Sequence, residues 1–283
     1  MKKYIVFAAF MLLPFMSFGQ MQIDTKKVRI SDFTQKTTKI VLTGNQFHDA
    51  GLMSEATAKW TVSPFEFCTL EEFESLKGDD NYYFLLTTKG QFKKESEPGL
   101  MFLTLVKGGQ NSGKGIGEML EIVSLPYASA EDPSGREMVF FSAFLDIIQK
   151  YTLDAIDKDM NAYIGLPNYS MNISKAGEMI LVFSEDDLNA EMTPEMRNLY
   201  FDKDILVLSE DEADECLISS KENTLVSYVA APSVPKPGSY CYKMLIDPQT
   251  NVLYYFRRHK ITKSAGPGFL IEDFKRITGP RRK

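Results

Sequence analysis

An internal duplication is the feature that most constrains the fold of this chain. The segment KIVLTGNQFHDAGLMSEATAKW (39–60) matches EMILVFSEDDLNAEMTPEMRNL (178–199) in its order of an apolar run, a polar turn and a helix-like stretch. FEFCTLEEFESL (65–76) then matches ILVLSEDEADEC (205–216), 140 residues further along. Identities are few, so the evidence is the shared order of elements. Such a repeat predicts two similar folding units.

Each copy predicts the same succession of strand, helix, strand, helix, strand, a strand pair and a closing helix. The third strand, at 82–86 or 225–229, is almost wholly apolar or aromatic, as in strands that are covered on both faces. The closing helices are expected at Glu137–Tyr151 and Gly268–Ile277. The sequence therefore predicts an α/β fold of two similar tandem domains, each a mixed sheet with helices packed on it.

The predicted helices carry matching start signals. Thr69 with Glu72 and Ser209 with Glu212 both fit the capping box, in which hydroxyl and acid satisfy each other's free backbone amides. Ser54 is expected to cap the first helix of the first copy.

The first twenty residues have the layout of a cleavable secretory signal. Lys2 and Lys3 precede the apolar run Tyr4–Phe18, which is shorter than the about 20 residues of a membrane span. We expect cleavage just before or after Gln20 and an exported protein, either periplasmic or secreted. No later segment is long and apolar enough to cross a membrane.

The remaining length suits two domains at roughly 150 residues each. Pro167 and the surrounding Asn and Ser residues predict a loop in the segment that joins the copies. The expected organisation is a signal peptide (1–20), a lead-in (21–36), a first repeat (37–152), a linker (153–175), a second repeat (176–279) and a basic tail (280–283).

The charge balance argues against nucleic-acid binding. The chain has 32 basic and 38 acidic residues, a net charge of −6, and loss of the signal would remove two more positive charges. Affinity for nucleic acid comes chiefly from basic groups on phosphates. No nucleic-acid partner is therefore predicted.

The stretch VKGGQNSGKGIGEM (106–119) comes close to a phosphate-binding P-loop. The position after Lys114 is Gly115, which has no hydroxyl for magnesium, and β-branched residues and Pro126 follow soon after. The second copy has the short turn DPQTN in this place. We interpret the stretch as a long hairpin, and a nucleotide site would require a helix after Gly117.

Cysteine and histidine usage predicts neither a metal site nor a cofactor. Cys68, Cys216 and Cys241 each face an apolar residue of the other copy, so we expect them in the core. A Cys216–Cys241 disulfide stays open as an alternative in an oxidising compartment. His48 and His259 are far apart in sequence, and His259 is expected to be exposed at a strand end.

Polar residues follow the first strand of each copy. Asn45, His48 and Asp49 do so in the first copy, and Glu185 and Asp186 in the second. Ligands of open α/β sheets bind at the carboxyl ends of the strands, so these five residues are the candidate ligand-binding set. The alternative is a pair of solvated turns, and convergence in one pocket would decide between them.

No catalytic motif of a known kind is present, so the sequence does not indicate an enzyme. The leading hypothesis is an exported, non-catalytic binding or interaction module of the cell envelope or secreted fraction, with another macromolecule as partner. The alternative is a small-molecule-binding protein or hydrolase, with its site in the inter-domain cleft or at the loop after the first strand.

Overall fold

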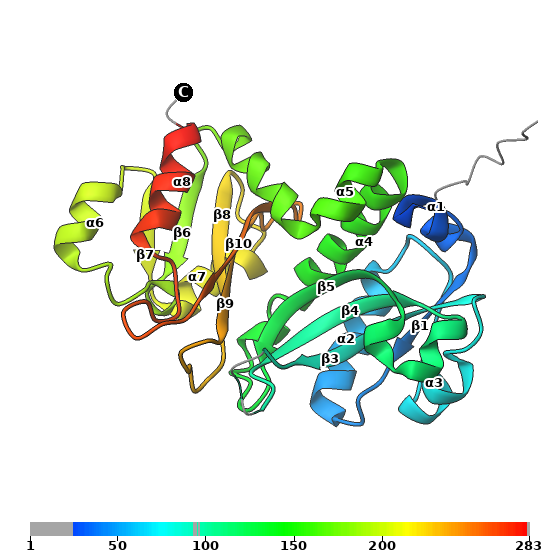
Figure 1. Ribbon diagram of the computed structural model, residues 1–283. Coiled ribbons are helices and arrows are strands. Elements are labelled where there is room, and N and C mark those ends of the chain that lie inside the picture. Colours follow the sequence, from blue (N-terminus) through cyan, green and yellow to red (C-terminus); the bar gives the residue numbers. More distant parts are fainter. Residues whose placement is uncertain (1–24, 93–94, 96, 282–283) are drawn as a thin grey trace, which may run out of the picture.

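The structure is a computed structural model that describes residues 25–281, except 93, 94 and 96. The predicted secretory signal lies outside these residues. Two five-stranded mixed sheets stand side by side, each with helices packed on it (Figure 1). This arrangement confirms the predicted α/β fold with two similar sheet units. None of the helices in the described part of the chain combines the length and the apolar character that crossing a membrane requires.

The first sheet has the strand order β2-β1-β3-β4-β5. β1 is parallel to β2 and β3, and β4 and β5 add to β3 as antiparallel strands. Its elements are β1 (Thr37–Val41), α2 (Gln46–Lys59), β2 (Phe65–Cys68), α3 (Leu70–Leu76), β3 (Tyr82–Gly90), β4 (Leu100–Lys107), β5 (Leu120–Ser129) and α4 (Phe141–Asp157).

The second sheet repeats this order as β7-β6-β8-β9-β10, with the same parallel and antiparallel pairs. Its elements are β6 (Ile180–Ser184), α6 (Pro194–Tyr200), β7 (Ile205–Leu208), α7 (Glu210–Ile218), β8 (Thr224–Ala230), β9 (Tyr240–Ile246), β10 (Leu253–Lys260) and α8 (Ile271–Arg281). Val106 pairs with Phe84 in the first sheet, and Ile246 pairs with Val226 in the second. Val106 and Ile246 lie 140 residues apart, as in the sequence match, whereas their partners Phe84 and Val226 lie 142 residues apart.

Local start signals explain where several helices begin. Both predicted capping boxes are present, at Thr69 with Glu72 and at Ser209 with Glu212. The prediction for Ser54 is wrong, because α2 begins nine residues earlier. The Asn45 side chain caps α2 by accepting hydrogen bonds from the amides of Phe47 and His48, each at 3.1 Å. His48 therefore lies in the first turn of a helix.

The segment between the repeats is helical where a loop was predicted. α4 runs on to Asp157, and α5 (Asp159–Ile164) and a 3₁₀ helix (Leu166–Lys175) follow. Pro167 lies in the first turn of the 3₁₀ helix, where a missing amide hydrogen costs nothing. The lead-in contains a short helix, α1 (Lys26–Ile30), capped by Thr25.

One hydrophobic cluster spans both repeats. Tyr228 of β8 packs against Phe140 and Phe144, with ring centroids 4.5 and 5.1 Å apart. The Tyr228 hydroxyl donates a hydrogen bond to the backbone carbonyl of Tyr127 in the other sheet. Buried aromatic contacts of this kind make the junction between the repeats part of the packed fold.

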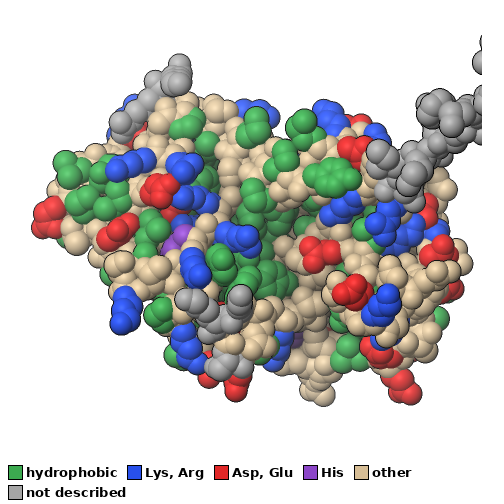
Figure 2. All heavy atoms as spheres, viewed as in Figure 1, with side chains coloured by type: hydrophobic (Ala, Val, Ile, Leu, Met, Phe, Trp, Pro, Cys, Tyr) green, Lys and Arg blue, Asp and Glu red, His purple; other side chains and the backbone are tan. Residues whose placement is uncertain are grey.

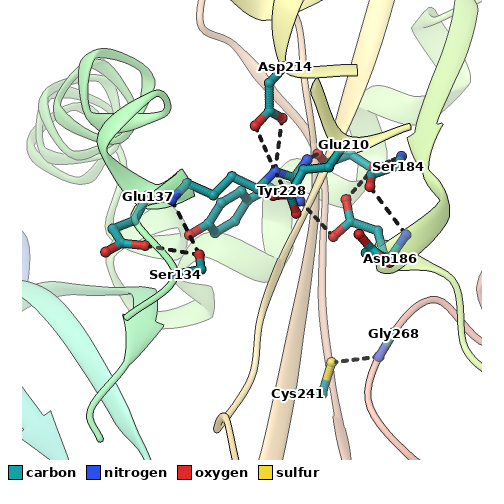
Figure 3. Close-up of polar contacts among 12 residues, drawn as sticks. Ser134, Glu137, Ser184, Asp186, Glu210, Asp214, Tyr228, Cys241 and Gly268 are labelled. Atoms are coloured by element: carbon teal, nitrogen blue, oxygen red, sulfur yellow. Dashed lines mark hydrogen bonds and ion pairs between the residues drawn. The ribbon is translucent and has the colours of Figure 1, made fainter. Parts of the chain in front are cut away.

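The three cysteines are buried and free, as the core interpretation predicted, and no Cys216–Cys241 disulfide is formed. Cys241 accepts a hydrogen bond from the amide of Gly268 (Figure 3), and burial raises its thiol pKa to about 12. His259 differs from expectation. It is half-buried in β10, with Nε2 2.8 Å from the carbonyl oxygen of Gly266, and burial is the main cause of its lowered pKa.

Candidate ligand-binding site

A cavity of about 550 Å³ lies at the carboxyl ends of β1 and β3 in the first repeat. We call it the strand-end cavity. Its walls come from β1, β3, β4 and β5, from the start of α2 and from the connection between β5 and α4. Apolar side chains form most of the wall, among them Val41, Leu86, Met101 and Met138. Pockets with mostly apolar walls and a few polar groups are the usual form of small-molecule sites.

A chain of polar side chains runs along one wall. His48 Nε2 lies 3.0 Å from the Tyr127 hydroxyl, and His48 Nδ1 lies 3.4 Å from Asp49 Oδ1. The Tyr127 hydroxyl is also 3.4 Å from Thr87 Oγ1. His48 and Tyr127 line the cavity, and Asp49 stands behind His48. A phenol that donates to Nε2 places the ring proton on Nδ1, toward Asp49.

Asp49 holds the turn between β1 and α2. Its carboxylate accepts hydrogen bonds from the Thr43 amide (2.9 Å), the Thr43 hydroxyl (2.8 Å) and the Gly44 amide (2.8 Å). Burial would raise the pKa of Asp49, but these hydrogen bonds outweigh it and hold the pKa below its ordinary value. Asp49 is therefore a charged anchor that fixes His48 in place.

Tyr127 is a hydrogen-bonding group and a poor nucleophile. Burial, aided by the charges of Glu137 and Asp49, raises its pKa to about 12 despite a hydrogen bond with Thr87. A nucleophile at neutral pH needs a shift in the opposite direction or an adjacent base that takes its proton. The phenol thus stays protonated, and the His48–Tyr127 pair offers polar contacts to a ligand.

Glu137 closes the far side of the cavity from a short 3₁₀ helix, Arg136–Met138, that precedes α4. The side chain is buried, and it accepts hydrogen bonds from the Gly135 amide (3.0 Å) and the Ser134 hydroxyl (3.3 Å). In Figure 3 its carboxylate points away from Asp214 and Asp186 of the second repeat.

At the same sheet edge of the second repeat, Arg136 lines a smaller cavity of about 370 Å³ and is held by an ionic network. Its Nη1 lies 2.9 Å from Asp187, its Nε 2.8 Å from Asp214, and its Nη2 donates to the Ser227 carbonyl at 3.2 Å. Burial would lower the pKa of Arg136, but the charges of Asp187 and Asp214 outweigh it and raise the pKa. We call these four residues the Arg136 network.

The structure divides the predicted ligand-binding set between the two repeats. Asn45 and His48 line the strand-end cavity, and Asp49 supports His48. Asp186 lines a different cavity, of about 370 Å³, between the repeats. Glu185 is exposed and forms an ion pair with Arg197, at 2.8 Å from Oε2 to Nη1.

Sequence reasoning missed Tyr127, Arg136 and Glu137. Tyr127 sits in an otherwise apolar strand, where a tyrosine looks like core. Arg136 and Glu137 follow the loop EDPSG, and the corresponding loop of the second copy, KSAGPG, leads into its closing helix without such a charged pair. That difference between the copies was the available signal.

The near P-loop does not have the geometry of a phosphate site. A 3₁₀ turn, Ile116–Glu118, follows Gly115, and then the chain enters β5, which pairs antiparallel with β4. A P-loop needs a helix in this place. The stretch is a long hairpin connection, as interpreted from the second copy, and the nucleotide hypothesis is withdrawn.

Another cavity, of about 420 Å³, lies in the groove between the repeats on the face shown in Figure 2, where hydrophobic side chains gather between the two lobes. Phe102, Tyr242 and Phe256 line it, together with charged groups such as Lys26 and Arg258. None of the predicted site residues reaches this groove.

Comparisons of the chain with protein-family models, with curated proteins and with solved structures gave no match. The site is therefore interpreted from its own geometry.

Proposed function

We propose that this protein is a non-catalytic binding protein whose first repeat takes up a small, largely apolar ligand in the strand-end cavity. One observation supports the proposal above the others. At the corresponding sheet edge the second repeat has the charged Arg136 network beside a smaller cavity of about 370 Å³, whereas the first repeat has a cavity of about 550 Å³ with mostly apolar walls. Apolar walls favour burial of an apolar ligand, at roughly 25 cal/mol per Å² of surface removed from water.

The polar groups in the wall suit binding better than chemistry. His48 is held between Asp49 and Tyr127, and the raised pKa of Tyr127 keeps its proton in place. Fixed donors and acceptors of this kind orient a bound molecule. Among hydrolase mechanisms, one with a covalent intermediate on Tyr127 is disfavoured, because the phenol is a poor nucleophile.

The test is a calorimetric titration with 2-naphthylmethanol, a neutral probe with an apolar body. We expect saturable binding at one site. Ala130→Trp should abolish it, because Ala130 lines the strand-end cavity and the indole would fill the space. Ala231→Trp is the matched control, since Ala231 lines only the cavity between the repeats. Absence of saturable binding, or equal loss in both variants, would contradict the proposal.

A macromolecular partner is the second candidate, favoured by two exposed apolar side chains beside the cavity. Phe47 is 72% exposed and Leu70 is 53% exposed. Exposed apolar groups that cluster can mark a contact surface. Double replacement by serine should release a partner that co-purifies from producing cells, whereas Val234→Ser, an exposed apolar control in the second repeat, should retain it.

We also propose that the protein is exported. The support is the basic start and short apolar run of the first twenty residues. The intact mass of the protein recovered outside the cytoplasm should correspond to a chain that begins beside Gln20. A full-length mass in that fraction would contradict signal cleavage.

A further inference from the structure

Glu137 is a buried carboxylate without a positive partner. It is 5% exposed, and its two hydrogen bonds, from Gly135 and Ser134, both go to Oε2. Among the residues that the structure describes, no lysine, arginine or histidine forms an ion pair with it. Burying a charge is costly unless an opposite charge or several hydrogen bonds compensate for it.

The neighbouring residue in the chain, Arg136, is a buried charge that has a full set of partners. Arg136 faces the second repeat, where two carboxylates and a carbonyl oxygen surround its guanidinium. Glu137 lines the strand-end cavity and also the cavity between the repeats, and among the described residues it has two neutral hydrogen-bond donors. Two adjacent residues with similar burial thus differ in their partners.

The other charged side chain at the cavity, Lys89, has a weaker electrostatic effect on a ligand. Lys89 lines the rim and is exposed, so water and salt screen its field. Interactions of a buried charge are several times stronger than those of a solvated one, because the effective dielectric constant is lower. A charged ligand would therefore respond chiefly to Glu137.

We propose that the ligand of the strand-end cavity is an organic amine with an apolar body, whose ammonium group pairs with Glu137. This inference rests on the proposed function of the cavity. The body would pack against Leu86, Met101 and Met138, and the ammonium would supply the hydrogen-bond donors that Glu137 Oε1 lacks. Tyr127 adds an aromatic ring near the charge.

The test compares three probes with the same ring system on the unaltered full chain at pH 7: 2-naphthylmethylamine, 2-naphthylmethanol and 2-naphthoate. We expect the amine to bind about tenfold or more tightly than the alcohol, as for a charge-assisted hydrogen bond in a buried site. The carboxylate should bind most weakly.

A conservative variant then assigns the preference to one side chain. Glu137→Gln keeps the acceptor for Gly135 and Ser134 but removes the charge. The ratio of the amine affinity to the alcohol affinity should fall to about one in this variant. Glu131→Gln is the matched control, because Glu131 lies in the same loop and is exposed. It should leave all three affinities unchanged.

The outcomes separate the two proposals. If the amine and the alcohol bind equally well to the unaltered protein, the amine inference is overturned and the cavity proposal stands. If 2-naphthoate binds best, Lys89 sets the preference and the inference is again overturned. If none of the three binds, the proposed function itself fails. The probe series decides the matter even if Glu137→Gln does not fold.

Discussion

The two repeats have the same strand order but use the same sheet edge in opposite ways. In the first repeat the carboxyl ends of β1 and β3 open into a cavity with His48, Tyr127 and Glu137 in its wall. In the second repeat the corresponding place has a smaller cavity, of about 370 Å³, lined by Arg136, whose charge Asp187 and Asp214 neutralise. The topology fixes where a site can form, and a few side chains at the strand ends decide its size and polarity.

The largest expected effect comes from removing the buried cation of Arg136. Arg136→Met would leave Asp187 and Asp214 buried without their cation, and we expect the free energy of unfolding to fall by about 3–5 kcal/mol. Urea denaturation followed by circular dichroism measures it. Glu137→Gln, one residue along, should stay within about 1 kcal/mol of the unaltered protein. If Arg136→Met lowers the free energy of unfolding by less than about 1 kcal/mol, the Arg136 network does not hold the repeats together.

A smaller effect is expected where one sheet has an ion pair and the other a leucine. Lys243 of β9 is fully buried and pairs with Asp273, and Leu103 holds the same register position in β4. Lys243→Leu should cost about 3 kcal/mol, because Asp273 keeps only Tyr255 and Arg257 as side-chain partners.

The double variant Lys243→Leu with Asp273→Leu sharpens this second prediction. It gives the second sheet the leucine of the first and should recover part of the loss, since no unpaired carboxylate remains, although the buried Tyr255 hydroxyl and the Leu270 amide lose their acceptor. The same denaturation experiment measures it. A double variant as unstable as the single one would show that the ion pair contributes through packing and not through charge.

The capping boxes should behave alike in the two repeats. Thr69→Ala and Ser209→Ala each remove one side-chain acceptor at a helix start, and each should cost about 1 kcal/mol. Chemical denaturation of the two variants side by side measures both values. A difference much larger than the error would mean that the helix starts are not equivalent, although their sequences match.

The smallest effect concerns pH and the segments that lead into each repeat. Asp32 ties the first lead-in to Lys107 of β4 at 2.8 Å, whereas Ser170 ties the second to the backbone of Phe256. Burial would raise the pKa of Asp32, but hydrogen bonds from Lys107, Tyr83 and Lys36 outweigh it and lower the pKa to about 2.

A lowered pKa in the folded state means that Asp32 stabilises the fold above the pKa of the unfolded chain, near 4. This contribution is lost as the pH falls through about 2. Asp32→Asn should therefore lower stability at pH 6 by less than about 1 kcal/mol, because the group is partly exposed. The difference from the unaltered protein should vanish toward pH 2, and Ser170→Ala should show no such pH dependence.

Much of the fold follows from sequence because its signals are local. Apolar runs predicted the strands, matched capping boxes predicted the starts of α3 and α7, and the repeat predicted that both sheets share one order. The prediction for Ser54 was wrong because a serine inside a helix and a serine that caps a helix look alike in the sequence. Asn45 caps α2 nine residues earlier, so Ser54 lies inside the helix. The prediction of a loop between the repeats was wrong because a proline such as Pro167 is also compatible with the first turn of a helix.

The candidate site was less accessible to sequence reasoning. His48 and Asn45 were found because they follow a strand directly. Tyr127 and Glu137 reach the same cavity from residues about 80 and 90 positions away in the chain, and only the pairing of β4 with β5 and the path into α4 bring them there. The size and lining of a strand-end cavity depend on such distant residues, so local patterns do not reveal them.

Arg136 and Glu137 are consecutive residues that serve opposite repeats, and this constrains how the gene can diverge. Their Cα atoms are held about 3.8 Å apart by one peptide bond. An insertion or deletion between residues 130 and 136 would displace both side chains, and one between the two would turn one of them to the wrong side. Loops usually tolerate changes in length. This one couples the wall of a cavity to the joint between two repeats, so its length should be among the most conserved features of any relative.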